Sequence, residues 1–466
     1  MSHPPRIAVI LAAGRGTRMG GERPKVLHRA AGRSLLGWSL AAAREAGCER
    51  ILVIVGYGAE QVKEEIHGDD ITWVLQREQR GTGHALAQAE SEISGPATLL
   101  VVPGDAPLVT AATLDALAQR VESGGFWGSL AVADLDRPGS LGRVLAADAE
   151  GRTLDRIVEA ADASPEELAV RTVNTGFYAL PAPETFDFLR RIGSDNAQGE
   201  LYLTDAPGVA RADGKSVALL TLDDAAEALG VNSRSDLAQV HQALLARQAE
   251  RLMAAGVTVL DPASTVIEAA VQVGVDTVLH PGVHLLGETA IGAGCEIHAG
   301  CWLRDSQVGD GTVMRPYSVL EEARVESQVQ IGPFSRLRPK AHLAAGSRVG
   351  NFVEVKNAHL GPGAKAGHLA YLGDAEVGAG ANIGAGVVTC NYDGYGKHRT
   401  VIGEGAFVGS DTMLVAPVEV GREATTAAGS VIHQEVPEGA LGVGRARQKN
   451  IPGWRERQAR KHRKEE

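Results

Sequence analysis

The chain has 466 residues, of which 22% are charged, and its formal net charge is −11 at pH 7. This length is enough for two or three domains, each with its own core. The acidic balance argues against a general nucleic-acid-binding protein, which would carry a basic surface.

Neither a secretory leader nor a membrane span is evident. No basic stretch precedes an apolar run at the N-terminus, and no window approaches the roughly 20 apolar residues that cross a bilayer. The four cysteines, at 48, 295, 301 and 390, form no CxxC pair. We therefore expect a cytoplasmic protein with reduced thiols, no nucleic-acid partner and no membrane insertion.

Residues 1–234 alternate short β-branched runs with amphipathic stretches, which predicts an α/β domain with a mainly parallel, Rossmann-like mixed sheet. Strands are expected at 7–11, 51–55 and 99–102, and helices at 35–46 and 59–66. Over 235–255, apolar residues recur at helical spacing among Arg, Gln and Glu. This pattern predicts a helical linker.

Residues 256–466 follow a period of six, often with Gly after the aliphatic residue. Because a helix has a period near 3.6 and a regular strand a period of two, neither explains this spacing. Three hexads per turn instead predict a parallel β-helix with one very short strand on each face. The pattern resembles the left-handed β-helices of sugar and CoA acyltransferases. The longest runs are Ile267, Val273, Leu279, Leu285, Ile291, Ile297 and Leu303, then Val325, Ile331, Leu337, Leu343, Val349 and Val355.

A glycine-rich turn follows the first expected strand. It reads LAAGRGTRM at 11–19, with RPK at 23–25. Such a turn lets backbone N–H groups approach phosphate oxygens, while Arg and Lys neutralise charge. Met19 replaces the third Gly of the dinucleotide fingerprint, and the P-loop pattern is absent. The whole string resembles the sugar nucleotidyltransferases.

Further segments of the N-terminal half extend this resemblance. The segment LQREQRGTGHA, at 75–85, is similar to the family's uracil-recognition segment, and Asp105 follows a strand at its carboxyl end, where ligands of open α/β sheets collect. By resemblance, Asp105 and Asn232 are Mg²⁺ ligands, and their oxygens suit that ion. Some relatives carry Tyr where this chain has Pro103, which puts a side-chain contact there in doubt.

The resemblance assigns two further roles. Arg18 and Lys25 would stabilise developing charge as catalytic residues. The residues expected to bind nucleotide and sugar are Leu11, Ala12, Ala13, Gly14, Lys25, Gln76, Gly81, Thr82, Gly104, Asp105, Gly142, Glu159, Asn174 and Asn232.

Segments that interrupt the hexads carry functional residue types. GHLAYLGD stands at 367–374, and TCNYDG at 389–394 opens an insertion that ends near Lys397. Together they resemble the acetyltransferase half of the bifunctional bacterial uridyltransferases. Because imidazole exchanges protons near neutral pH, His368 is the expected general base. The resemblance assigns Arg338, Lys356, Tyr371 and Asn382 to the sugar phosphate, and Ala385, Asn391, Tyr392, Ser410, Ala428 and Arg445 to acetyl-CoA.

The resemblance implies two reactions. Acetyl-CoA would acetylate glucosamine-1-phosphate, and UTP would then react with N-acetylglucosamine-1-phosphate, releasing pyrophosphate and supplying a precursor of peptidoglycan and lipopolysaccharide. It also implies a homotrimer with acyl-donor sites at its seams. The alternatives are a single-function nucleotidyltransferase with a regulatory or oligomerising β-helix, and a non-catalytic assembly subunit. Each alternative predicts loss of site residues that this chain retains.

Two other features stand outside these assignments. From Arg445 onward there are nine Lys or Arg against three Asp or Glu, which is typical of a solvated tail or of contact with a polyphosphate. The histidines His280, His284, His298 and His359 raise the possibility of a zinc site like that of β-helical carbonic anhydrases. Because no motif matches that site, we expect no zinc.

Overall fold

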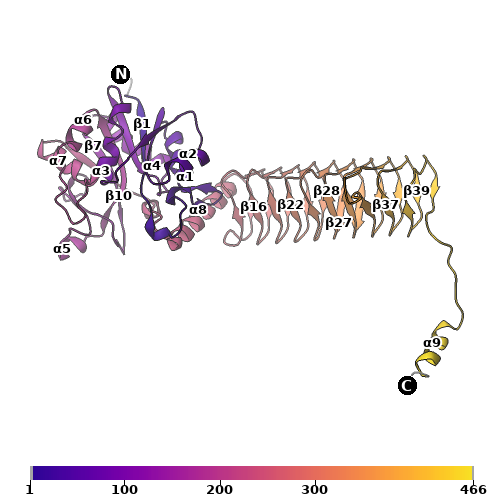
Figure 1. Cartoon of the computed structure of the whole chain (residues 1–466). Helices are drawn as coiled ribbons and strands as arrows, with labels where there is room; N and C mark the ends of the chain where they lie inside the picture. The colour runs from indigo at the N-terminus through magenta and orange to yellow at the C-terminus, as the bar shows by residue number, and fades with distance from the viewer. Residues whose placement is uncertain (1–3, 464–466) are drawn as a thin grey trace. The chain divides into compact units, whose positions relative to one another are not determined.

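The computed structural model describes residues 4–463 and divides into two compact units, with the boundary between Arg247 and Gln248 (Figure 1). The boundary lies within helix α8 (Arg234–Ala254), which covers the segment where a helix was expected. No helix among the described residues is long and apolar enough to cross a membrane.

The N-terminal unit is built on a twisted mixed sheet with strand order β11-β7-β10-β6-β1-β4-β5. Only β10 runs antiparallel to its two neighbours in this path. The expected strands and their parallel pairing are confirmed. The strands are β1 (Arg6–Ala12), β4 (Arg50–Val55), β5 (Ile71–Leu75), β6 (Ala97–Pro103), β7 (Gly128–Asp134), β8 (Arg143–Ala146), β9 (Leu154–Val158), β10 (Thr172–Ala182) and β11 (Val217–Thr221).

Helices cover both faces of this sheet because its central strands are apolar on both sides. In β1, Ile7 and Val9 enter one core cluster, whereas Ala8 and Ile10 enter another on the opposite face. The expected helices at 35–46 and 59–66 are confirmed as α1 and α2. The helices of this unit before α8 are α1 (Leu35–Glu45), α2 (Ala59–Glu65), α3 (Thr82–Ala87), α4 (Ala111–Glu122), α5 (Pro165–Leu168), α6 (Glu184–Leu189) and α7 (Ala206–Ala212).

The C-terminal unit is a parallel β-helix made of strands of two to four residues. Its three parallel sheets run from β12 (Thr258–Val259) to β41 (Leu441–Gly442), from β13 (Val266–Ile267) to β40 (Val431–Ile432), and from β14 (Gln272–Val273) to β38 (Val418–Val420). We call them the first, second and third sheets. The chain visits them in turn, which confirms the parallel β-helix predicted from the hexads and is consistent with the left-handed family that the pattern resembles.

Aliphatic residues at the six-residue positions form the core of this prism. All those in the two longest runs are buried except Val273, which is half-buried at the N-terminal end. One coil takes 18 residues from Val278 to Glu296 and 17 from Glu296 to Val313. This difference of one residue is the reason that the six-residue run shifts after Leu303.

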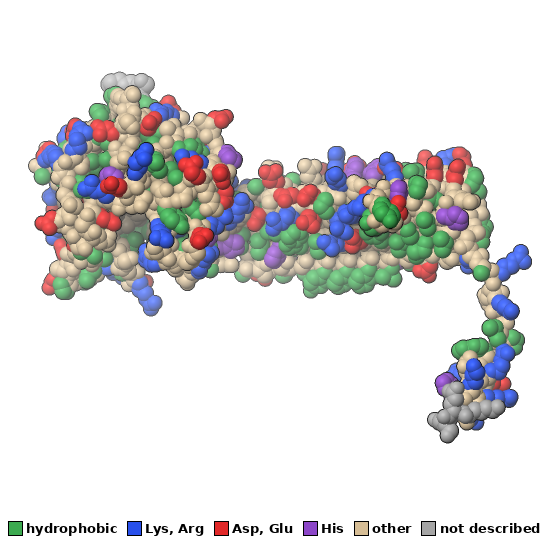
Figure 2. Space-filling model, in the orientation of Figure 1, with side chains coloured by type: hydrophobic (Ala, Val, Ile, Leu, Met, Phe, Trp, Pro, Cys, Tyr) green, Lys and Arg blue, Asp and Glu red, His purple; other side chains and the backbone are tan. Residues whose placement is uncertain are grey.

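One corner of the prism, between the first and second sheets, carries exposed apolar side chains. Tyr317, Phe334 and Phe352 have left-handed φ and stack with ring centroids 5.4 and 5.5 Å apart. We call these three residues the aromatic ridge. Leu369, also exposed, follows at the same corner, since its N–H donates to the carbonyl of Asn351. In the space-filling view, hydrophobic side chains gather in a strip along an edge of the β-helix (Figure 2).

Candidate functional site

A cavity of about 290 Å³ lies at the carboxyl ends of β1 and β6. Gln76 is buried at its wall, and its amide donates to the carbonyl of Gly81 at 3.2 Å. Gly81 has a φ of +106° and lies against the backbone of Leu201, so only glycine fits there. The lining is Leu11, Ala12, Ala13, Gly14, Lys25, Val26, Gln76, Gln79, Gly81, Thr82, Ala85, Pro103, Asp105 and Glu200.

A cation already stands between the two expected metal ligands. The Lys25 ammonium pairs with the Asp105 carboxylate and lies 3.3 Å from Oδ1 of Asn232. The N–H of Val231 donates to the Asp105 carbonyl at 2.9 Å, which ties the two ligand segments together. The carboxylate and amide oxygens therefore converge on a position that attracts positive charge.

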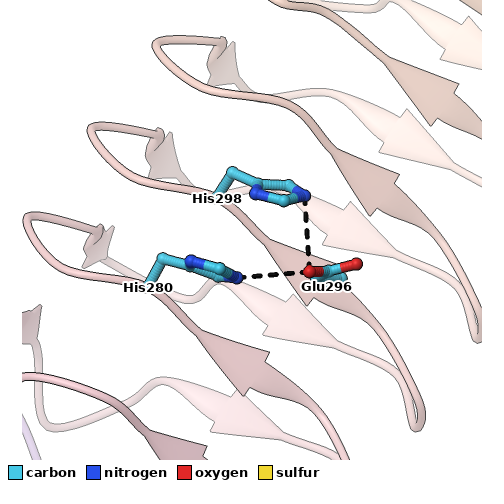
Figure 3. A group of neighbouring side chains, drawn as sticks. All are labelled: His280, Glu296 and His298. Atoms are coloured by element: carbon cyan, nitrogen blue, oxygen red, sulfur yellow. Dashed lines mark hydrogen bonds and ion pairs between the residues drawn. The ribbon is translucent and has the colours of Figure 1, made fainter.

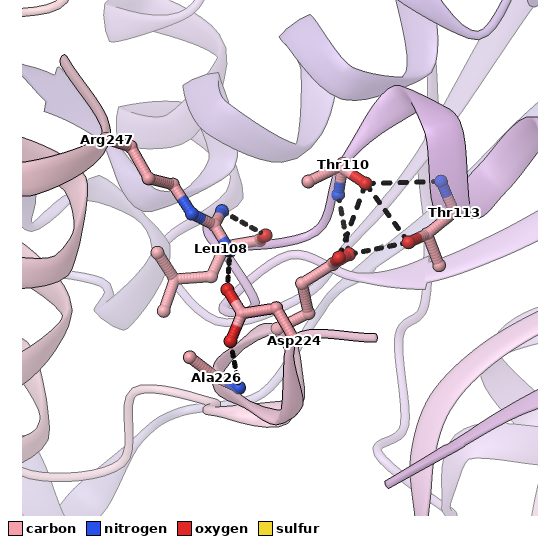
Figure 4. Close-up of polar contacts among 7 residues, drawn as sticks. Leu108, Thr110, Thr113, Asp224, Ala226 and Arg247 are labelled. Atoms are coloured by element: carbon pink, nitrogen blue, oxygen red, sulfur yellow. Dashed lines mark hydrogen bonds and ion pairs between the residues drawn. The ribbon is translucent and has the colours of Figure 1, made fainter. Parts of the chain in front are cut away.

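Polar contacts, from buried to exposed, hold these ligand segments in register (Figure 4). The Glu227 carboxylate accepts from the N–H of Thr110 at 3.0 Å and from the hydroxyl of Thr113 at 2.8 Å, at the start of α4. Arg247 donates to the carbonyl of Leu108 at 2.6 Å and to Asp224 at 2.8 Å. The hydrogen bonds of Glu227 and Arg247 therefore join the loop after Asp105 to the segment before Asn232.

The expected sugar-binding residues form a neighbouring group. The N–H of Asn174 donates to the Gly142 carbonyl at 2.9 Å, and a Cβ on Gly142 would lie 3.3 Å from Oε2 of Glu159. Burial raises the pKa of Glu159, while a 2.9 Å hydrogen bond from the Thr204 hydroxyl opposes that rise. Gly142, Glu159 and Asn174 are therefore adjacent, although none of them is among the residues lining the cavity.

Three further residues of the N-terminal unit differ in how they lie relative to the cavity. Pro103 lines the cavity, and its ring packs where a Cβ on Gly176 would stand, so it presents an apolar surface and no hydroxyl. Gly104 is buried behind it against β1. Arg18 is exposed and is not among the lining residues.

In the β-helix, His368 ends strand β30 (Lys365–His368) at the corner between the first and second sheets. Its Nδ1 lies 2.6 Å from Oδ1 of Asn351, one coil earlier. Because the amide oxygen accepts, Nδ1 carries the proton, and Nε2 keeps a free lone pair. The imidazole is thereby oriented as a proton acceptor.

Three cations gather where strands of the second sheet lead to the third sheet. Arg338 follows β25 (Arg336–Leu337), Lys356 ends β28 (Glu354–Lys356), and Lys397 stands in the insertion before β35 (Thr400–Ile402). Lys397 and then Arg338 lower the pKa of Lys356, since like charges disfavour its protonated form. Two carboxylates oppose them, since Asp374 acts to raise the pKa of Lys356 and Oε1 of Glu354 lies 2.8 Å from a guanidinium nitrogen of Arg338. Such a cluster favours binding of an anion with more than one negative charge.

An asparagine and a tyrosine lie beside the cations. A Cβ on Gly373 would lie 2.7 Å from Nδ2 of Asn391 and still closer to the Tyr371 hydroxyl, so both side chains cover this glycine. Asp374 accepts hydrogen bonds from the amides of Asn391 and Asn357, and Asn391 is buried. Asp374 therefore fixes the orientation of Asn391.

The small residues expected at the CoA site follow His368 along the same corner. Backbone hydrogen bonds connect successive coils there, from Gly386 to Leu369, from Asp411 to Ala385 and from Gly429 to Ser410. His368, Ala385, Ser410 and Ala428 thus form one column. Asn382 belongs to the first sheet, in β33 (Asn382–Ile383), away from the cations of the second sheet. Tyr392 and Arg445 are exposed.

Comparison with known proteins decides the family. A model of the MobA-like NTP transferase domain matches residues 8–259. The chain is 47% identical to a bifunctional protein GlmU of Trichlorobacter lovleyi over 96% of this chain and 97% of that protein. It is 49% identical to the bifunctional protein GlmU of Azotobacter vinelandii, again over 96% of this chain.

The chain belongs to the GlmU family. It is therefore a bifunctional enzyme with a nucleotidyltransferase domain. Among solved structures, a UDP-glucose pyrophosphorylase complexed with UDP-glucose is 17% identical, with a TM-score of 0.44, and covers 52% of this chain and 99% of its own.

Several residues of this GlmU-family chain escaped the sequence analysis. Asp374 and Lys397 lie in segments that were singled out, and Asn351 lies five residues before the expected Lys356. Their roles depend on contacts with other coils, which the sequence alone does not show. Gln79 stands within the expected uracil segment, so its place in the cavity could have been anticipated. Nothing in the sequence around Glu200 pointed to the cavity.

Proposed function

We propose that the chain makes UDP-N-acetylglucosamine in two steps, acetylating glucosamine-1-phosphate on the β-helix and transferring uridylyl in the N-terminal unit. The observation that carries the proposal is the presence of both sets of polar groups on one GlmU-family chain. One set joins Lys25, Asp105 and Asn232. The other consists of the His368–Asn351 pair and three cations, which lie at the two ends of second-sheet strands.

In the N-terminal unit, a 1-phosphate oxygen of the sugar attacks the α-phosphorus of UTP, and pyrophosphate leaves. This reaction depends on position and charge neutralisation more than on a covalent intermediate. Backbone groups of the turn at 11–14 receive phosphate oxygens, Lys25 and Arg18 stabilise charge, and Gln76 reads the base.

The oxygens of Asp105 and Asn232 suit Mg²⁺, and the ammonium between them supports a cation at that position. When bound, Mg²⁺ would neutralise phosphate charge. Gly142, Glu159 and Asn174 hold the N-acetylglucosamine group next to these ligands.

On the β-helix, Nε2 of His368 takes a proton from the 2-amino group as that amine attacks the acetyl thioester. A C–N bond forms, the C–S bond breaks, and the proton held on Nε2 passes to the sulfur, so that CoA leaves as the thiol. Arg338, Lys356 and Lys397 hold the sugar phosphate, Tyr371 and Asn391 orient the amine, and the small residues at 385, 410 and 428 admit the pantetheine arm. Arg445 meets a phosphate of CoA.

We also propose that the enzyme is a cytoplasmic homotrimer. The exposed aromatic ridge leads to the corner of His368, and a second copy packed there would cover it. Asn382 lies on a different sheet from Lys356 and Tyr371, so it can join a sugar-phosphate site at a seam between copies. Light scattering should give three times the chain mass, and a fully acetylating monomer would refute the assembly.

The function is tested by supplying glucosamine-1-phosphate, acetyl-CoA, UTP and Mg²⁺ together and then leaving out one substrate at a time. UDP-N-acetylglucosamine, free thiol and pyrophosphate should form in equal amounts. Without acetyl-CoA, pyrophosphate should appear only when N-acetylglucosamine-1-phosphate is added. Thiol release without pyrophosphate, or the reverse, in the complete mixture would contradict the bifunctional assignment.

A further inference from the structure

Two stacked histidines lie on the first sheet, outside both sites described above. His280 follows β15 (Val278–Leu279) and His298 follows β18 (Glu296–Ile297), so they take the same position in successive coils. Their ring centroids are 4.5 Å apart. Figure 3 shows both rings directed at the carboxylate of Glu296, an outward-facing residue of β18.

The contacts of this pair differ from those of the second histidine pair on the β-helix. The rings of His342 and His359 also neighbour each other, tilted and with centroids 4.7 Å apart, but they bond to different carboxylates, at 2.9 Å from Glu326 and 2.5 Å from Glu376. By contrast, Nε2 of His280 and Nε2 of His298 lie 3.3 and 3.5 Å from the same oxygen of Glu296. The nitrogen–oxygen distances among His280, Glu296 and His298 are therefore longer than those of the two ordinary hydrogen-bonded pairs.

These spacings match the edges of a metal coordination polyhedron. Bonds of about 2.0–2.2 Å to nitrogen and oxygen, arranged tetrahedrally, separate neighbouring ligand atoms by roughly 3.4 Å. The three ligand atoms all lie within 4.8 Å of one another. Within residues 4–463, this is the one such group of histidine, cysteine and carboxylate side chains.

We propose that His280, Glu296 and His298 bind a divalent transition-metal ion, with zinc as the reference ion. Two imidazoles and one carboxylate form a ligand set that suits zinc, cobalt or nickel and disfavours Mg²⁺, which prefers oxygen. The half-exposed Glu296 leaves a side open to a water ligand. Arg315, at the same position one coil later, is the nearby cation that limits affinity.

The proposed site departs from the expectation that these histidines bind no zinc. That expectation rested on the absence of a motif like that of β-helical carbonic anhydrases, whereas here a carboxylate supplies the third ligand. Because the ligands come from two successive coils, the ion joins them through side chains in addition to the backbone ladder. Neither proposed reaction uses this site, so the site is independent of both activities.

The test uses the full chain carrying Asp105→Ala, which removes the proposed magnesium site, after treatment with a chelator. Isothermal titration with ZnCl₂ should give one ion per chain, and CoCl₂ should produce the visible absorption of four-coordinate cobalt. Adding His280→Ala and His298→Ala should weaken zinc binding by more than the 10–100-fold that loss of an outer partner of a metal ligand costs.

The matched control is His342→Ala with His359→Ala, which removes the other pair of neighbouring histidines and should leave zinc stoichiometry and the cobalt spectrum unchanged. Circular dichroism checks folding of every variant, since all four histidines lie outside the core. Unchanged zinc binding after loss of His280 and His298, or equal loss in the control, would overturn the proposal.

Discussion

The two units build their sites in opposite ways. In the N-terminal unit, groups from distant segments meet, as where Lys25 reaches Asp105 and Asn232, 80 and 207 residues further along the chain. On the β-helix, the partner of the expected base lies one coil away, since Asn351 lies 17 residues before His368. The first site therefore depends on correct assembly of the whole sheet. The second depends on the register of a few neighbouring coils.

This difference predicts that the two activities can be removed separately. It also predicts that a substitution disturbs more site residues in the N-terminal unit than on the β-helix. A change in the N-terminal unit that loosens the loop after Asp105 disturbs several ligands at once. A change on the β-helix is confined to the neighbouring coils, because a repeat contacts only its neighbours.

The largest effect is expected for Asp105→Ala, which removes the carboxylate from the convergent cation position. Uridylyl transfer should fall on the order of 10³-fold, as when preorganised charge stabilisation is lost. Pyrophosphate release measures this change, and thiol release from acetyl-CoA should stay near the unmodified rate. Asp136→Ala, at an exposed ion pair, is the control. Equal loss of both activities in a folded variant would break the comparison.

His368→Ala should lower acetyl transfer by about 10²-fold or more, because the general base is lost. Asn351→Ala should cost less, about tenfold, since Nε2 remains but the ring is no longer oriented. Thiol release under saturating substrates measures both. His359→Ala, on the third sheet, should change nothing. If Asn351→Ala were as active as the unmodified enzyme across pH 6–9, it would not be a positioning residue.

The third prediction concerns pH at the cation cluster. Because Lys397 and Arg338 lower the pKa of Lys356, that ammonium is lost at a lower pH than usual, and KM for glucosamine-1-phosphate should rise as pH rises through it. Lys397→Met removes the larger cause, raises the pKa of Lys356 and should move this rise to higher pH. Lys340→Met, an exposed lysine, is the control. A shift to lower pH would contradict the charge assignment.

The smallest effect is expected at Glu159. Burial raises its pKa, so the carboxylate should become protonated at a higher pH than an ordinary glutamate, and KM for N-acetylglucosamine-1-phosphate should rise as pH falls through that value. Thr204→Val removes the opposing hydrogen bond and should move the rise to higher pH. Thr185→Val, which removes a hydroxyl bonded to the carbonyl of Pro181, should leave the profile in place.

Much of the fold was predictable because burial leaves a regular mark on the sequence. A coil of the β-helix buries one aliphatic residue per side, so six-residue spacing predicts three sheets. Central strands of the N-terminal sheet are covered on both faces, so they are continuously apolar, as in β4. Their ends were less certain, and β6 extends two residues before the run at 99–102 and one residue after it.

The contacts within the sites were less predictable, because they depend on register between segments. Tyr371 and Asn382 were expected side by side, but β32 (Ala375–Val377) of the third sheet lies between them in the chain. Counting three hexads per turn would have separated them. The meeting of His280, Glu296 and His298 needs the coil length, which is 18 residues here and 17 in the next coil. A motif search at fixed spacing does not find it.

The column at the corner of His368 also sets a length. Coils are separated by the spacing of neighbouring strands, about 4.8 Å, so Ala428 stands three coils, about 14 Å, beyond the base. If the acyl donor follows this column as proposed, the length of the column sets the length that its pantetheine arm must have. An acyl donor whose arm is too short to span three coils would bind but would not bring its acetyl group to His368. Inserting one coil between Ala385 and Ser410 should make the enzyme prefer a donor with a longer arm.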